Sequence, residues 1–168
     1  MNAGKNLLKL YMNHPELAES EWEVEKTAGQ VGYPDTDNPD VFFFLGLYYL
    51  KLQRFQQAYR ELKRAFELLE SYTGDDVIYL KGNFERALVW MAGICQRLEL
   101  PEEELYYGIL ALRVNRRLEG VACEVLRLLT PQELQARGAR HVGVLPDGIY
   151  DPVGGRVLPF LFQGSRVG

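Results

Sequence analysis

Few side chains in this chain have the types and spacing that catalysis or metal binding requires. The histidines, His14 and His141, lie far apart in the sequence, and Cys95 and Cys123 occur in apolar stretches without a nearby histidine. Two cysteines without partner histidines cannot build a zinc site, so we expect reduced thiols in the core. No phosphate-binding Gly-Lys loop and no dinucleotide fingerprint occurs. We therefore expect no enzyme activity, no metal and no cofactor.

Two short acidic runs have structural explanations. Asp35-Thr36-Asp37 has the form of a metal-binding acidic pair, but it follows a loop rich in Pro and Gly rather than a buried strand. We interpret it as the entry to a helix. Glu102-Glu103-Glu104 follows Pro101, where negative charge is favourable at a helix N-terminus.

The composition is that of a soluble globular domain. The chain has 168 residues, of which 47% are apolar and 25% charged, and this length allows one domain with a real core. The net charge of −4 argues against a nucleic-acid partner. No secretory signal is recognisable, and no apolar run reaches the roughly 18 residues needed to cross a bilayer. We expect a cytoplasmic protein without a membrane partner.

Hydrophobic periodicity predicts a helical chain from the start to about residue 138. Asn38 can cap a helix that Pro39 opens, and His14-Pro15 ends the first helix. Gly82 is a candidate break within a long helix. The predicted helices cover residues 3–13, 16–30, 39–51, 55–69, 75–98, 120–129 and 131–138, and another helix begins at Pro101 and includes Leu112.

The last thirty residues have a different character. From Ala139 onward, Gly and Pro separate short apolar runs. Pro146-Asp147-Gly148 and Gly154-Gly155 are turn signals that flank strand-like segments. We expect residues 139–168 to be either a small hairpin or a disordered tail, and both alternatives stay open.

The spacing of eight residues predicts two short helices packed against each other. Small residues alternate with large ones at three- and four-residue steps, so each helix has an apolar stripe and a place for close approach. This segment resembles a tetratricopeptide repeat, a family that alternates two helices over about 34 residues. The residues that carry the resemblance are Phe42, Leu45, Gly46, Tyr49, Phe55, Ala58, Leu62 and Ala65.

The resemblance extends over about three units, from residue 39 to 137, with cap helices over residues 3–30. Ala92 takes the place of Gly46 after 46 residues rather than 34, so about twelve residues would be inserted around Ser71 to Gly82. Glu104 stands where the family has a small alanine. The resemblance implies an all-α fold, an α-α superhelix of helical hairpins, with a short non-helical C-terminal tail.

A looser resemblance exists to the helical tails that follow the catalytic domain of some bacterial family-2 glycosyltransferases. Asn38-Pro39 and the run Arg116-Arg117-Leu118-Glu119 carry it. It implies a non-catalytic accessory domain.

The tetratricopeptide resemblance also implies where a partner would bind, because the first helix of each unit lines the concave side of such a stack. We expect an apolar patch of exposed side chains there, rimmed by positive charge. The predicted groove residues are Phe43, Leu47, Leu50 and Lys51 in the first unit, Arg86, Val89, Gln96 and Arg97 in the second, and Cys123 and Arg127 in the third.

The predicted function is protein–protein binding, as an adaptor, assembly factor or chaperone. The expected partner is a peptide or helix with apolar anchors and some acidic residues. The chain's own tail or a second copy, which would make a homodimer, are alternative occupants of the groove. An accessory domain related to a bacterial glycosyltransferase and a small secretion chaperone are alternative functions.

Overall fold

The computed structural model describes residues 3–128, 143–145, 148–151 and 156–159. The chain divides into two compact units, Met1–Ala87 and Leu88–Gly168, referred to below as unit 1 and unit 2. All the regular structure over residues 3–128 is helical, which confirms the all-α fold class for this part of the chain. The predicted superhelical arrangement stays a prediction, and the expected boundary between residues 138 and 139 lies outside the described residues.

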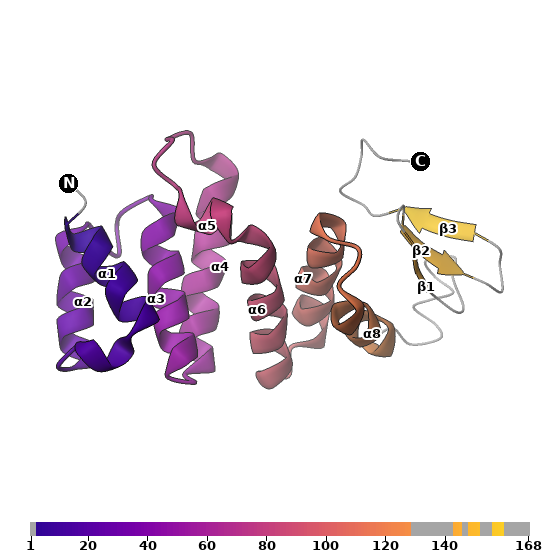
Figure 1. Ribbon diagram of the computed structural model, residues 1–168, viewed down its shortest axis with the longest axis horizontal. Helices are drawn as coiled ribbons and strands as arrows, with labels where there is room; N and C mark the ends of the chain where they lie inside the picture. Colours follow the sequence, from indigo (N-terminus) through magenta and orange to yellow (C-terminus); the bar gives the residue numbers. More distant parts are fainter. Residues whose placement is uncertain (1–2, 129–142, 146–147, 152–155, 160–168) are drawn as a thin grey trace. The chain divides into compact units, whose positions relative to one another are not determined.

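Unit 1 is built around an antiparallel pair of helices (Figure 1). The pair consists of α3 (Pro39–Lys51) and α4 (Phe55–Ser71). The helix α1 packs against both α2 and α3, and the short α5 also contacts α3. The other elements of unit 1 are α1 (Ala3–Asn13), the 3₁₀ turn η1 (Pro15–Leu17), α2 (Glu21–Gln30), α5 (Tyr79–Gly82) and the first turn of α6 (Phe84–Arg97).

Side-chain caps determine where two of these helices begin. The Asn38 side chain accepts a hydrogen bond from the amide of Asp40 at 2.9 Å, and Pro39 opens α3, as predicted. The predicted helix over residues 16–30 begins too early, because residues 15–17 form the 3₁₀ turn η1 and α2 starts at Glu21. Ser20 caps α2 by accepting from the amide of Glu23 at 3.4 Å, and the Glu23 carboxylate accepts from the amide of Glu19 at 2.9 Å. This reciprocal capping starts a new helix at Glu21.

A glycine brings α3 and α4 together. A Cβ atom at Gly46 would lie 2.6 Å from Cγ of Leu62, which is far inside van der Waals contact. Ala58 and Ala65, also on α4, are fully buried. The small residues at the predicted positions therefore permit the close approach of the two helices.

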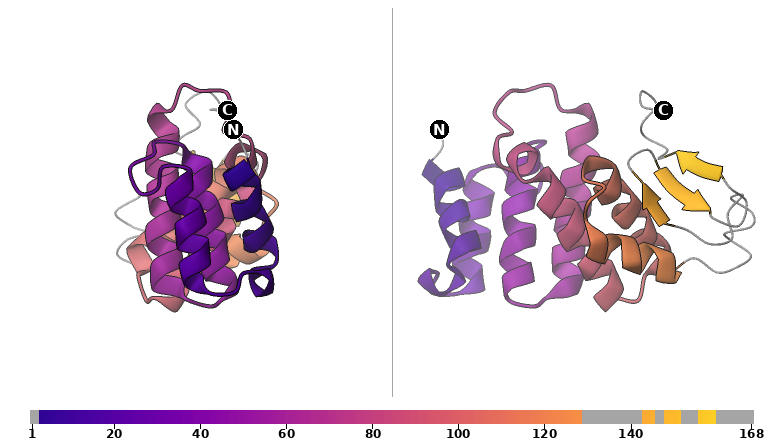
Figure 2. Two further views of the ribbon diagram at one scale, coloured as in Figure 1. Left: turned by 90° about the vertical axis from the view of Figure 1, so that its left-hand side faces the viewer. Right: turned by 45° about the vertical axis from the view of Figure 1, so that its right-hand side comes forward.

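The segment between α4 and α6 is held by one buried carboxylate. Residues 72–78 form a loop that projects beyond the helix ends (Figure 2). Asp40, with no exposed surface, accepts hydrogen bonds from the amides of Ile78, Tyr79 and Leu80 at 2.9, 3.1 and 2.8 Å. Lys5 places its ammonium 3.2 Å from the same carboxylate. The predicted helix over residues 75–98 therefore begins later than expected, at Tyr79, where Asp40 caps α5. It is interrupted at Asn83, next to the candidate break at Gly82, and α6 follows.

Unit 2 contains most of α6, α7 (Pro101–Val114) and α8 (Glu119–Leu128). The turn between α6 and α7 repeats the turn between α3 and α4. Gln53 has φ of 59° and Glu99, 46 positions later, has φ of 58°. The amide that follows each donates to a carbonyl five residues back, Arg54 to Tyr49 and Leu100 to Cys95, both at 2.9 Å. The two hairpins thus share one register, offset by 46 residues.

The C-terminal part of unit 2 contains a three-stranded antiparallel sheet in the order β1-β2-β3. Its strands are β1 (Gly143–Leu145), β2 (Gly148–Asp151) and β3 (Arg156–Pro159). Val144 pairs with Ile149, and Tyr150 pairs with Val157. Strands thus lie on both sides of each predicted turn, whereas most of the turn residues, 146–147 and 152–155, lie outside the described residues.

Candidate functional site

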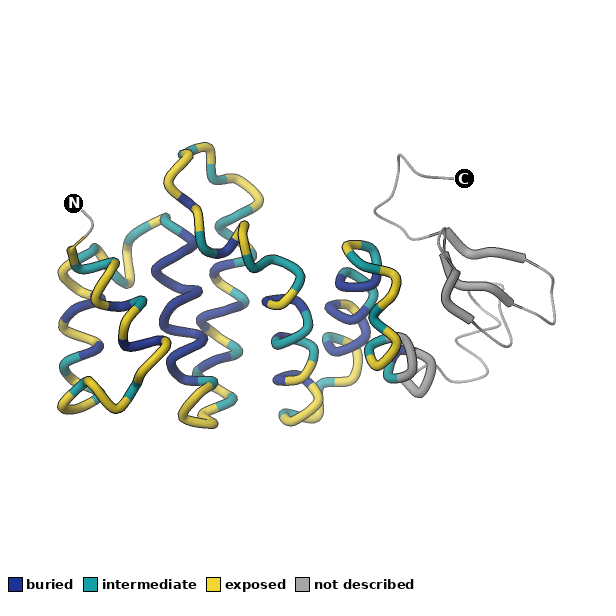
Figure 3. Tube along the Cα trace, in the orientation of Figure 1, coloured by how far each residue is buried: buried dark blue, intermediate teal, exposed yellow. Residues whose placement is uncertain are grey.

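The prediction that α3 exposes an apolar patch is wrong. Phe43 is 1% exposed and Leu47 is 7% exposed, and α3 is buried along nearly its whole length (Figure 3). The cause is that α3 contacts α1, α4 and α5, so no face of it is left open. A helix that is apolar all round, as this one is, belongs in a core.

The other two predicted groove residues of α3 lie at its C-terminal end. Leu50 is half-buried and Lys51 is exposed. The Lys51 ammonium donates a hydrogen bond to the carbonyl of Asn13 at 3.0 Å, and this contact links the ends of α3 and α1. The α3 side of the predicted groove is therefore occupied by the chain's own first helix.

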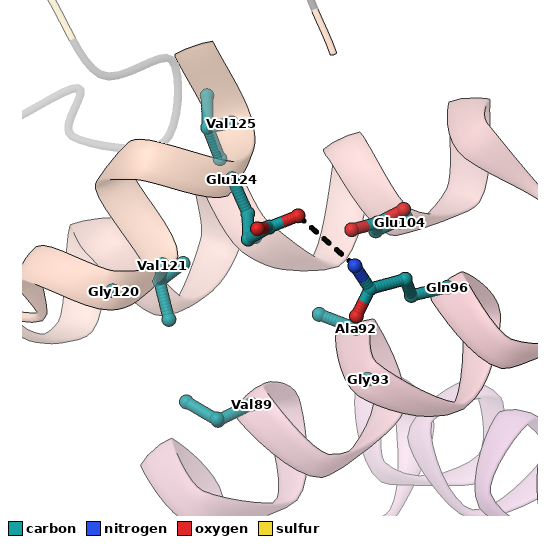
Figure 4. Close-up of a pocket in the computed structure, with 10 residues that line it drawn as sticks. Val89, Ala92, Gly93, Gln96, Glu104, Gly120, Val121, Glu124 and Val125 are labelled. Carbon is teal, nitrogen blue, oxygen red and sulfur yellow. Dashed lines mark hydrogen bonds between the residues drawn. The ribbon is translucent and has the colours of Figure 1, made fainter. Parts of the chain in front are cut away.

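Unit 2 has a pocket on the equivalent face of its first helix. Val89, at the position of Phe43 in the 46-residue register, lies one turn before Gly93, at the position of Leu47. Both residues line the pocket, and α7 and α8 provide its other walls (Figure 4). The lining residues are Val89, Ala92, Gly93 and Gln96 of α6, Glu104 and Gly108 of α7, and Gly120, Val121, Glu124 and Val125 of α8.

The size and lining of this pocket suit one or two apolar side chains. Its volume is about 270 Å³, below the 300–1,000 Å³ range of typical small-molecule sites. Most of the lining residues are valine, alanine or glycine. A Cβ atom added to Gly93 or Gly120 would have no atom within 4 Å, so these two glycines border open space. The pocket can therefore accept one or two apolar groups.

Polar groups gather on one side of the pocket. The Gln96 side chain of α6 donates a hydrogen bond to the Glu124 carboxylate of α8 at 3.1 Å. Glu104 of α7 is 6% exposed and also lines the pocket. Figure 4 shows the two carboxylates on the same side as the Gln96 amide, whereas Val89 and Val121 border the other side. The pocket thus has an apolar part and an acidic part.

Three substitutions relative to unit 1 account for the pocket. Gly93 provides no side chain where Leu47 fills space in unit 1, and Glu104 stands where unit 1 has Ala58. Gly108 takes the place of Leu62 and turns toward α8, since a Cβ there would lie 2.8 Å from Cγ2 of Val125. The close packing is therefore between α7 and α8 in unit 2, and the face of α6 is left partly uncovered.

The structure brings together only some of the predicted groove residues. Val89 and Gln96 both line the pocket, whereas Arg86 and Arg97 are exposed elsewhere on α6. Arg127 and Cys123 belong to α8, and their side chains lie outside the described part of the structure, as do His141 and the predicted helix over residues 131–138. Sequence reasoning missed Glu124 and Val121. The signal that could have found them is the small-residue set Gly93, Gly108 and Gly120, which marks where three helices leave space or approach closely.

Unit 1 has buried polar groups whose roles are structural. Glu61 on α4 is 8% exposed and accepts a hydrogen bond from the hydroxyl of Tyr33 at 2.7 Å. Burial raises the pKa of the Glu61 carboxyl, and the Tyr33 hydrogen bond partly opposes that shift. Burial, followed by the contact with Glu61, raises the pKa of Tyr33 as well. This pair ties the loop after α2 to α4.

The predicted acidic entry to α3 is a loop, as expected. Asp35 and Asp37 are exposed, and the Thr36 hydroxyl accepts a hydrogen bond from the amide of Asn38 at 3.1 Å. Cys95 is a buried thiol that takes part in no disulfide. Over the described residues, no three His, Cys, Asp or Glu side chains come together in a way that could hold a metal ion.

In unit 2, burial affects the Arg113 side chain. Burial lowers the pKa of the Arg113 guanidinium to about 10, and the nearby Tyr106 opposes the shift. Arg113 lies in the last turn of α7, where positive charge is favourable. Arg113 remains charged at neutral pH.

None of the helices in the described part of the chain has the length and apolar character needed to cross a membrane. Comparisons with protein-family models, with curated proteins and with solved structures found no match to this chain.

Proposed function

We propose that this chain is a protein-interaction module, an adaptor, assembly factor or chaperone, that binds a helix or extended peptide of a partner. The observation that carries the proposal is the open pocket of unit 2 between α6, α7 and α8. A pocket of about 270 Å³ lined by small apolar residues is the kind of feature that receives an anchoring side chain in helix-in-groove recognition.

The tetratricopeptide-like register supports this proposal. Unit 2 repeats the hairpin frame of unit 1, including its turn, but leaves the first-helix face partly uncovered. In the repeat family that this frame resembles, the first helices of the units form the binding surface. The buried thiol of Cys95 supports a cytoplasmic location, since reducing compartments preserve thiols. The glycosyltransferase-accessory alternative stays a prediction.

The test blocks the pocket without disturbing the fold. Gly93→Leu fills the open space beside Gly93, and Gly29→Leu is its matched control, because a Cβ at Gly29 also meets nothing within 4 Å. Both glycines lie within helices, so each substitution raises helix propensity. Peptides selected from a random displayed library against the full chain are then measured by fluorescence polarisation.

We expect the selected peptides to bind Gly93→Leu at least about tenfold more weakly than the wild type, since about 1.4 kcal/mol of lost contact has that effect. They should bind Gly29→Leu with unchanged affinity. Equal affinity for all three proteins, or failure to select any peptide, would contradict the proposal.

A further inference from the structure

The outward face of α7 carries apolar side chains where the equivalent helix of unit 1 carries charges. In the 46-residue register, the run Leu105–Leu112 of α7 corresponds to the run Tyr59–Phe66 of α4. The α4 run contains four charged residues, whereas the α7 run contains none. Since the hairpin of unit 1 folds with charges on this face, the apolar outer face of α7 is not a requirement of the hairpin itself.

Three side chains of α7 form one exposed stripe. Tyr106, Leu110 and Val114 follow one another at steps of four residues, so they lie on the same side of the helix. Tyr106 is 52% exposed, Val114 is 49% exposed, and Leu110 between them is half-buried. In α4 the first two of these places hold Arg60 and Arg64, which are both exposed. An exposed apolar stripe of this kind marks an interaction surface.

Charged residues lie at both ends of this stripe, and their signs are opposite. Glu102, exposed in the first turn of α7, precedes Tyr106 by four residues and therefore lies on the same side of the helix. Arg116 and Arg117, also exposed, follow shortly after the end of α7. The stripe thus has an acidic N-terminal end and a basic C-terminal end.

From this pattern we propose that the outer face of α7 binds the same face of a second copy of the chain, with the two helices antiparallel. A two-fold symmetric contact brings one surface against itself, so that surface must be complementary to its own reversed image. In an antiparallel pair centred between Tyr106 and Leu110, each tyrosine faces the leucine of the other copy. The acidic end of one helix then lies beside the basic end of the other, at both ends of the contact.

The charges disfavour other arrangements of the same stripe. Parallel pairing would place the Glu102 carboxylates of the two copies side by side, and like charges at short range are destabilising. Pairing of α7 with the outer face of α4 would bury Arg60 and Arg64 against an apolar surface, which costs free energy because a cation loses its hydration there. The antiparallel pair of α7 helices has neither defect.

The stripe is separate from the unit 2 pocket. Glu104 and Gly108 face the pocket from α7, whereas Tyr106, Leu110 and Val114 do not line it. The proposed contact between two copies therefore does not use the pocket. The inference goes beyond peptide binding and does not depend on it.

The oligomeric state of the full chain is the first test. One helix from each copy makes the contact, and interfaces of such small size belong to weak complexes. We therefore expect a dimer whose dissociation constant lies in the micromolar range. Sedimentation velocity over a wide range of concentration should show a rise from monomer to dimer and no larger species, because a two-fold contact is closed.

A substitution in the stripe tests its place in the dimer. Tyr106→Arg introduces the residue type that α4 has at the equivalent position, and it should raise the dissociation constant at least about tenfold, because two cations would enter an apolar contact. Trp22→Arg is the matched control, since Trp22 is an exposed aromatic residue of α2 and should not affect the dimer. Circular dichroism checks that both variants fold. Equal dissociation constants in the wild type and Tyr106→Arg would overturn the inference.

An exchange of charges tests the antiparallel orientation. Glu102→Arg places like charges beside Arg116 and Arg117 of the second copy and should weaken the dimer about threefold or more, since the contact occurs twice. Adding Arg116→Glu and Arg117→Glu to this variant should restore the affinity, because the pairs form again with reversed signs. Gln56→Arg, at the equivalent exposed place in α4, is the control and should leave the dimer unchanged.

Two further results would contradict the proposed dimer. One is a wild-type chain that stays monomeric at every concentration, and the other is a triple variant that dimerises no more tightly than Glu102→Arg alone. Neither result bears on the peptide experiment, because Gly93→Leu changes the pocket and leaves the outer face of α7 intact. The proposed function and this inference can therefore fail independently.

Discussion

At the same register, offset by 46 residues, α3 of unit 1 carries Phe43 and Leu47 where α6 of unit 2 carries Val89 and Gly93. The two hairpin turns agree closely, since they have the same positive φ and the same hydrogen bond back to the first helix. The large residues of α3 are buried in a filled core, whereas the small residues of α6 line a pocket. The same helix position can therefore fill a core or border an open pocket, depending on side-chain volume.

The first helices of the two hairpins also differ at their N-terminal ends. Asp40 of α3 is fully buried and holds the amides of residues 78–80, whereas Arg86, at the equivalent place in α6, is exposed. Unit 1 thus uses this position to fasten an inserted segment. Unit 2 has no such use for it among the described residues.

The largest loss of stability is expected when the Asp40 carboxylate is removed, because the equivalent position in unit 2 has no such buried group. Asp40→Ala leaves three backbone amides without their acceptor and deprives the Lys5 ammonium of its buried partner. Breaking a buried ion pair in this way costs about 3–5 kcal/mol of unfolding free energy. Urea denaturation measures the loss, and hydrogen exchange should show faster exchange of the Leu80 amide.

Arg86→Ala is the matched change at the equivalent place in unit 2, and it should alter stability by about 0.5 kcal/mol or less, as exposed substitutions do. A comparable loss in both variants would show that the two positions do not differ as described.

Two glycine-to-alanine substitutions are expected to change the free energy of unfolding by an intermediate amount and in opposite directions. Gly46→Ala places a methyl group 2.6 Å from Cγ of the buried Leu62, and overpacking of this kind costs about 1–3 kcal/mol. Gly93→Ala adds its methyl group to open space and should gain up to about 1 kcal/mol from helix propensity. Thermal and urea unfolding measure both changes. If both substitutions changed stability in the same direction, the contrast between a filled and an open helix face would not hold.

The smallest effect concerns the buried glutamate of α4. The folded state raises the pKa of Glu61, so it binds the proton more tightly than the unfolded state does. The resulting stabilisation is fully present below the unfolded pKa, near 4.3, and is lost as pH rises through the raised folded pKa. Glu61→Gln keeps an acceptor for Tyr33 and removes this dependence. It should therefore be more stable than the wild type at neutral pH.

Unfolding free energies measured at several pH values test this prediction. Glu70→Gln, an exposed substitution on the same helix, is the control for the same change of residue type at a site outside the core. An identical slope in Glu61→Gln would mean that burial does not shift this carboxyl.

Much of the fold was predictable because its signals are local. Asn38 and Pro39 mark the start of α3, Pro101 marks the start of α7, and Gly46 predicts a close approach between helices, all as the structure has them. The start of α5 was not predictable, because it depends on Asp40, which is 38 to 40 positions away in the sequence. No local pattern reveals that a distant carboxylate will cap a helix.

The candidate site was predictable only in part, for a different reason. The register placed Val89 and Gln96 on the correct face of α6, and both line the pocket. The same register placed Phe43 and Leu47 on an open face, which is wrong because the preceding helix α1 packs on α3. The run Val41 to Leu45, apolar without interruption, is the sequence signal that this helix is covered all round.

The Asp40 carboxylate also limits which helices of unit 1 can be deleted or duplicated. In a simple repeat array each hairpin touches only its neighbours, so a whole hairpin can be removed or duplicated without harm to the others. Here a single side chain of α3 joins Lys5 of α1 to the amides that begin α5. Loss of α1 would remove the ammonium partner of this carboxylate, and loss of the inserted segment would remove all three of its amide donors. Unit 1 should therefore be engineered as one piece.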